Sequence, residues 1–111
     1  MSIGTTPGRL EGESSPDLDL LRQIHQATGV PLVLHGGSSV PDAVMRAAIE
    51  SGIAKVNIDA AIRRTFTSAL AGTYAAGGYP TDPRKVLAKA RDAVESLVAE
   101  KIRLFGSQGK V

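Results

Sequence analysis

Residues 31–59 read PLVLHGGSSVPDAVMRAAIESGIAKVNID, and this stretch decides the fold. An apolar run at 30–34 leads into His-Gly-Gly-Ser, and a second at 53–58 leads into Asn-Ile-Asp. Between them Pro41 begins, and Gly52 ends, a predicted helix with an apolar face. A strand, helix, strand order predicts a right-handed parallel unit. Polar groups at the carboxyl ends of neighbouring parallel strands are typical of α/β active sites.

Upstream, residues 2–5 are predicted to end a strand, and residues 8–15 to form a polar loop. Ser15-Pro16 has the pattern of a helix start, with serine as the cap and proline at the first helical position. Leucine and isoleucine then recur at helical spacing until Gly29, which is expected to end the helix. The first strand, being continuously apolar, is expected to be buried on both faces.

Downstream, a helix is predicted from Asp59, a break at residues 77–81, and a last helix from Asp82-Pro83-Arg84 to Phe105. We expect a single partial domain over 1–111, made of a loop and helix (1–29), two strand-helix units (30–76) and a C-terminal helix (82–105). The whole chain of 111 residues is too short for a (β/α)₈ barrel of about 250 residues. The apolar stripe of the last helix is predicted to be core or subunit interface, at Leu87, Ala90, Val94, Leu97, Val98, Ile102 and Phe105.

The amino-acid composition argues against several classes of function. Thirteen Lys and Arg face eleven Asp and Glu, and there are two Tyr, two Phe and no Trp, so a nucleic-acid partner is not expected. The absence of cysteine excludes disulfides and thiolate chemistry. No apolar run approaches the ~20 residues of a membrane span, and no signal peptide is recognisable, so a cytoplasmic protein without a membrane partner is expected.

Several motifs together resemble the C-terminal part of the class II (metal-dependent) fructose-bisphosphate and tagatose-bisphosphate aldolases. The similarity covers nearly the whole chain. Its motifs are Ile3-Gly4-Thr5, residues 31–38 with His35, residues 55–59 with Asn57, Asp82-Pro83-Arg84-Lys85, and residues 101–107. The resemblance implies an α/β fold, the last two or three strands of a TIM barrel with their helices. It also implies a lyase of carbohydrate metabolism and glycolysis that cleaves a ketose bisphosphate to dihydroxyacetone phosphate and an aldehyde.

The same resemblance implies residue roles. His35 matches one of three histidines that bind a catalytic zinc, and Asn57 matches a residue beside the enediolate intermediate. Arg84 matches an arginine that reaches the substrate phosphate of a neighbouring subunit, which implies a homo-oligomer or a complementing chain. The positions assigned to the sugar-phosphate ligand are Gly8, Gly36, Ser38, Asp59 and Arg84.

The sequence departs from the family pattern at the metal. Pro7 stands where the family has its second zinc histidine, and proline cannot coordinate a metal. The third histidine and the catalytic acid belong to a part of the family that this chain does not match, and His25 lies in mid-helix without a second ligand. Binding of zinc by this chain alone is therefore not expected. Glu11 replaces a lysine and Ala60 a threonine, which predicts weaker phosphate binding.

Simpler structural interpretations stay open at each position. Gly36, Gly37 and Ser38 are also typical of a tight turn followed by a helix cap. Asp59 fits a helix N-cap better than a catalytic acid, because a carboxylate repels phosphate. Asn57 has about even odds of serving only as a strand-end hydrogen-bonding group. Arg84 is equally consistent with a surface position.

Three functional hypotheses follow. The chain is the C-terminal portion of a zinc aldolase, inactive alone; or a non-catalytic module for sugar-phosphate binding or assembly; or a truncated gene product without a function of its own. Loss of the histidine at Pro7 favours the second over an active enzyme.

Overall fold

The computed structural model describes residues 3–5, 12, 14–77 and 82–110. The chain divides into two compact units, Met1–Ala60 and Ala61–Val111. The division falls within the region 30–76, and the expectation of one domain over 1–111 stays a prediction. None of the helices in the described residues is long and apolar enough to cross a membrane.

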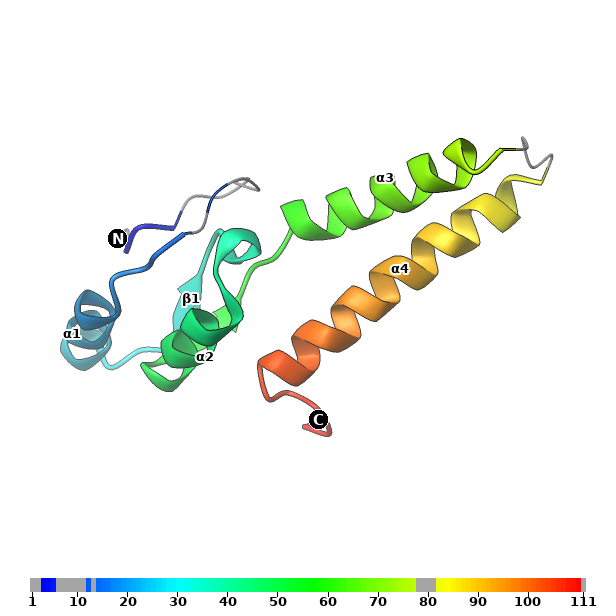
Figure 1. The fold of residues 1–111 in the computed structure, drawn as a ribbon. Helices are drawn as coiled ribbons and strands as arrows, with labels where there is room; N and C mark the ends of the chain where they lie inside the picture. The colour runs from blue at the N-terminus through cyan, green and yellow to red at the C-terminus, as the bar shows by residue number, and fades with distance from the viewer. Residues whose placement is uncertain (1–2, 6–11, 13, 78–81, 111) are drawn as a thin grey trace. The chain divides into compact units, whose positions relative to one another are not determined.

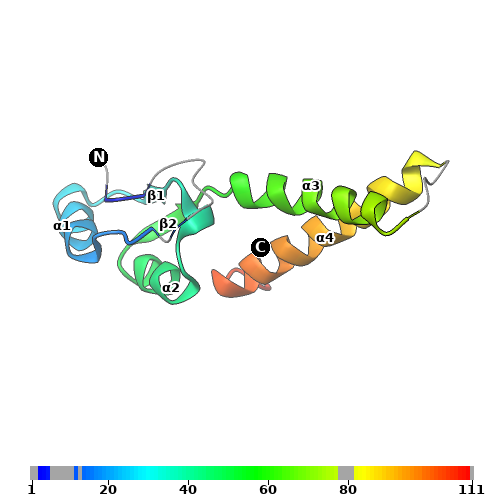
Figure 2. The ribbon, with the colours of Figure 1, turned by 45° about the horizontal axis from the view of Figure 1, so that its top comes forward.

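The first unit is a small α/β layer. Its helices are α1 (Leu18–Thr28) and α2 (Asp42–Glu50), its strands β1 (Leu32–Leu34) and β2 (Ile53–Val56), and a 3₁₀ turn, η1 (Gly37–Ser39), follows β1. The strands pair in parallel, and Figure 2 shows them side by side. Helix α2 packs on β2, and α1 packs on α2 (Figure 1). The parallel strand-helix-strand unit predicted from the sequence is thus confirmed.

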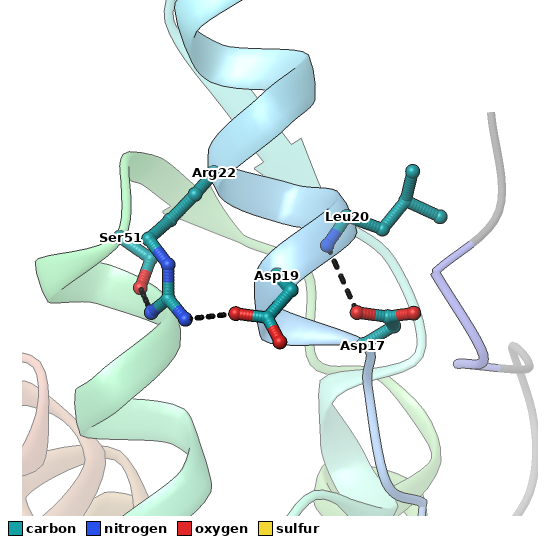
Figure 3. Close-up of polar contacts among 5 residues, drawn as sticks. All are labelled: Asp17, Asp19, Leu20, Arg22 and Ser51. Carbon is teal, nitrogen blue, oxygen red and sulfur yellow. Dashed lines mark hydrogen bonds and ion pairs between the residues drawn. The ribbon is translucent and has the colours of Figure 1, made fainter.

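The N-cap of helix α1 lies two residues later than predicted. Asp17, and not Ser15, is the N-cap, and its carboxylate accepts a hydrogen bond of 2.9 Å from the backbone N–H of Leu20 (Figure 3). Arg22 pairs with Asp19 one turn away, and a guanidinium N–H donates to the Ser51 hydroxyl at the end of α2, 3.4 Å away. Gly29 ends the helix in the left-handed region, at φ 63°, as predicted.

One face of the sheet is covered and the other is open. The helix-covered side buries Leu34 and Ile53 against apolar side chains of α1 and α2, of which Met45 is 1% exposed. A register shift makes Lys55 the partner of Val33, and both are exposed, Val33 by 45%. The expectation that the first strand is buried on both faces is therefore wrong, because the described elements cover only one side of it. The buried apolar residues of this unit are Leu21, Ile24, Leu34, Val40, Met45, Ala48 and Ile53.

Residues 3–5 form no strand, contrary to the prediction for 2–5. Gly4 has φ 97°, outside the β region. The carbonyl of Ile3 accepts a hydrogen bond from the N–H of Asp17 at 2.8 Å, so this segment is tied to the start of α1 and not to a sheet.

The second unit consists of α3 (Ala60–Ala75), whose first residue closes the first unit, and α4 (Pro83–Leu104). Helix α4 begins as predicted, with Asp82 as N-cap and proline at the first position. Of the predicted stripe, Ala90 is buried, whereas Leu87, Val98 and Ile102 are 38–49% exposed. The other buried positions of α4, Val86 and Leu104, lie outside the stripe. The prediction that the stripe is core holds for Ala90 and stays open as an interface for its exposed members.

Candidate functional site

A cavity of about 510 Å³ lies at the carboxyl ends of β1 and β2. Because the strands are parallel, the residues that follow each of them meet at one edge of the sheet. Ala60, the first residue of α3, also lines the cavity, and the amides at a helix start favour anions. The lining residues are His35, Gly36, Ser38, Val56, Asn57, Ile58, Asp59 and Ala60. Five of the predicted site residues therefore share one pocket: His35, Gly36, Ser38, Asn57 and Asp59.

Two glycines allow the turn after β1 to pass close to β2. Gly36 has φ 72°, in the left-handed region that other residues rarely adopt. Gly37 is buried, and a Cβ atom there would lie 2.7 Å from Cγ1 of Val56 and 3.2 Å from Cε of Met45. The turn can therefore pack against β2 and α2 only with glycine at position 37. This close approach brings Ser38 to the pocket wall.

Asn57 holds the two strand ends together. Its N–H donates to the carbonyl of Leu34 at 2.8 Å, and its own carbonyl accepts from the N–H of Gly37 at 3.3 Å. Its side-chain Nδ2 lies 3.1 Å from Nδ1 of His35. The backbone of Asn57 makes strand-end hydrogen bonds, as one of the two interpretations predicts. Its side chain contacts His35, the predicted metal ligand.

A buried serine anchors the turn from the N-terminal side. Ser14 is 3% exposed; its N–H donates to the carbonyl of Ser39 at 2.9 Å, and the two hydroxyl oxygens lie 2.6 Å apart. Sequence reasoning missed Ser14, because it lies in a polar, glycine-containing segment that carries no periodic pattern. The neighbouring Gly-Glu-Ser-Ser run gives no signal that one of its hydroxyls is buried.

The other predicted site residues lie elsewhere. Gly8 and Pro7 fall outside the described residues. Arg84 belongs to the second unit, in the first turn of α4, where its side chain is 90% exposed and bonds the Asp82 carboxylate at 3.0 Å. These hydrogen bonds hold the pKa of Asp82 below its ordinary 3.8 and raise the pKa of Arg84. Arg84 is thus exposed, which agrees with the surface interpretation and leaves its guanidinium reachable.

His25 has a packing role in the structure. Its Nδ1 is buried without a hydrogen-bond partner among the described residues. A Cβ atom on Gly52 would lie 2.5 Å from Cγ of the ring, so the imidazole lies close against the backbone of Gly52, which stands between α2 and β2. The sequence placed His25 in mid-helix among polar neighbours and gave no sign of this contact.

Comparison with known proteins identifies the family of the chain. The family model for class II fructose-bisphosphate aldolase matches residues 1–110. The chain belongs to the class II fructose-bisphosphate aldolase family. The resemblance to class II aldolases predicted from the sequence is therefore confirmed.

Relatives and a solved structure agree on how much of an aldolase the chain covers. The chain is 36% identical to fructose-bisphosphate aldolase of Geobacillus stearothermophilus and to the probable fructose-bisphosphate aldolase of Bacillus subtilis, over 98% of its own length and 38% of theirs. The crystal structure of the YdjI aldolase from Escherichia coli K12 superposes with a TM-score of 0.84 at 33% identity, covering 97% of this chain and 39% of that one. The chain thus resembles the C-terminal portion of a class II aldolase, an incomplete TIM barrel.

The described residues do not fit a catalytic zinc centre. Such a centre takes three protein ligands, and the described residues bring together no group of three His, Cys, Asp or Glu side chains that could hold a metal. Nδ1 of His35, the predicted metal ligand, contacts the amide of Asn57. No chemical step of this chain is therefore derived through zinc.

Proposed function

We propose that this chain binds a sugar phosphate, as the phosphate-binding portion of a class II aldolase-type site. The observation that carries the proposal is the pocket itself, where Gly36, Ser38 and Ala60 come together at the carboxyl ends of two parallel strands. In TIM barrels, phosphate sites are formed by loops after the last strands and by a helix start. A serine hydroxyl and closely approaching glycine backbone are the groups that such a site uses.

We propose aldol cleavage only for a longer polypeptide, or a complex of chains, that completes the barrel. The chain spans 38% of the length of the aldolases that it matches, so the remaining strands, two zinc ligands and the proton-transfer group would have to come from further polypeptide. Zinc there would supply the Lewis acid that polarises the ketose carbonyl. Alone, the chain is expected to bind ligand without cleaving it.

The proposal also covers partners and setting. A homo-oligomer or a complementing chain would cover the open face of the sheet at Val33 and Lys55, and exposed Arg84 would reach the phosphate of a neighbouring subunit. From the family assignment we also propose a role in glycolysis, in the cytoplasm. Glu11 and Ala60, where the family pattern has a lysine and a threonine, predict weaker affinity than in complete aldolases.

Isothermal titration calorimetry of the full chain with dihydroxyacetone phosphate, in the presence of EDTA, tests the proposal. Saturable binding is expected, with none of unphosphorylated dihydroxyacetone. Ser38→Asp places a carboxylate in the pocket and should weaken binding at least about tenfold by repulsion. Ser107→Asp, the same change at an exposed position after α4, should leave the affinity unaltered. Equal binding of the two ligands, or no binding of either, would overturn the proposal.

A further inference from the structure

Asn57 contacts the β1–η1 connection at three points. Its N–H binds the carbonyl of Leu34, its carbonyl binds the N–H of Gly37, and its side-chain amide binds Nδ1 of His35. The two backbone hydrogen bonds place the Cα atom of Asn57 beside the residue that follows β1, so its side-chain amide is within reach of the imidazole.

The direction of this hydrogen bond sets the proton of the ring. An amide NH₂ group can only donate, so Nδ1 of His35 must accept. A neutral imidazole carries one proton, which therefore lies on Nε2. Among the described residues none accepts a hydrogen bond from Nε2, and His35 lines the pocket.

A metal-binding histidine needs a free lone pair on one ring nitrogen and donates the N–H of the other to an acceptor. In His35 the lone pair of Nδ1 accepts the hydrogen bond of Asn57, and Nε2 carries the proton. While this contact is made, neither nitrogen has a lone pair to give to a metal. The ring thus offers a hydrogen-bond donor where the family places a metal ligand.

We propose that Asn57 is a positioning residue that holds His35 as an Nε2–H donor, and that His35 binds an oxygen of a phosphorylated ligand without metal. The inference rests on the proposed sugar-phosphate function for the identity of the ligand. The neutral ring adds a directed donor to the serine hydroxyl and the glycine backbone of the turn. The pocket then recognises a phosphate monoester by hydrogen bonds alone.

Nitrogen-15 NMR of the histidine rings, on the full chain with EDTA and without ligand, tests the tautomer directly. We expect neutral His35 to carry its proton on Nε2. In Asn57→Asp the carboxylate can only accept, so the proton should move to Nδ1. In Asn57→Ala both tautomers should be populated. A wild-type ring protonated on Nδ1 would overturn the inference.

Binding of dihydroxyacetone phosphate tests the donor. His35→Gln carries its amide nitrogen near the position of Nε2 and should retain binding within about threefold, whereas His35→Asn lacks a donor there and should lose about tenfold, the usual effect of one hydrogen bond to a charged group. Zinc should not tighten binding. Tighter binding with zinc that His35→Gln abolishes, or equal affinities of the two variants, would overturn the inference.

The two proposals fail differently. If the ligand does not bind to the wild-type chain, the sugar-phosphate function is wrong, and with it the role of His35 toward phosphate. If the ligand binds without metal but His35 carries its proton on Nδ1, the function stands and the donor role is wrong. His35 is exposed, so neither of its variants is expected to unfold the chain.

Discussion

Ser14 and Ser39 are joined twice, by a backbone hydrogen bond of 2.9 Å and by a contact of 2.6 Å between their hydroxyl oxygens. Ser39 ends the turn that carries Ser38, and Ser14 belongs to the segment that precedes α1. The pair therefore ties two segments 25 residues apart beside the pocket.

Removing both hydroxyls of the pair should destabilise the fold by less than the sum of the two single losses. Ser39→Ala leaves the buried Ser14 hydroxyl without its partner, which costs about 1–3 kcal/mol, and Ser14→Ala costs about 1 kcal/mol. In the double variant no unpaired hydroxyl remains, so its loss should be smaller than the sum. Urea unfolding of the full chain measures all three, with the exposed Ser96→Ala as control. Strict additivity would contradict the coupling.

Gly37→Ala should destabilise the chain by about 1–3 kcal/mol through overpacking, because the new Cβ would lie 2.7 Å from Val56. Gly72→Ala is the matched control: nothing lies within 4 Å of a Cβ there, in the last turn of α3, so alanine should stabilise by up to about 1 kcal/mol. Val56→Ala should relieve part of the Gly37→Ala loss in the double variant. Equal effects at both glycines in thermal unfolding would show that the turn has room to move.

Local patterns predicted those features that depend on neighbours in the chain. Pro41, Gly29 and Asp82-Pro83 marked helix boundaries correctly, because caps and turns are set by the residues beside them. The convergence of His35 and Asn57 also followed from the sequence, since consecutive parallel strands end at one edge.

Features that depend on tertiary packing were not predictable. The cap moved from Ser15 to Asp17, because the Asp17 carboxylate reaches the first turn of α1. Within the apolar stripe of α4, Leu87 and Val98 are exposed, whereas Val86, which lies outside the stripe, is buried. A helix with apolar residues on several sides does not reveal which side packs. The Ser14 contact and the His25 ring over Gly52 join distant segments and leave no periodic signal.

Gly52→Ala should lower the free energy of unfolding more than Gly29→Ala does, although both glycines have positive φ. At Gly29, with φ 63° and open space around a Cβ, alanine brings only the left-handed strain of about 1–2 kcal/mol. At Gly52, with φ 114°, the Cβ would also lie 2.5 Å from the His25 ring. Truncating the ring in a His25→Ala/Gly52→Ala double variant should therefore recover the contact part of the loss and leave the strain. Equal losses at both glycines in chemical denaturation would exclude the ring contact.

The start of α4 should weaken in acid. Hydrogen bonds from Arg84 lower the pKa of Asp82 below its ordinary 3.8, so the folded state binds this proton less readily than the unfolded chain does. The stabilising contribution of the Asp82 cap is therefore fully present above pH 3.8 and is lost as the pH falls through the lowered pKa. An NMR titration of the Asp82 carboxyl measures this shift.

Arg84→Gln should return the pKa of Asp82 toward 3.8, whereas Arg91→Gln, which removes the partner of Asp92 further along the helix, should leave the pKa of Asp82 unchanged. If Asp82 of the unmodified chain titrates at or above 3.8, its hydrogen bonds to Arg84 do not persist in solution.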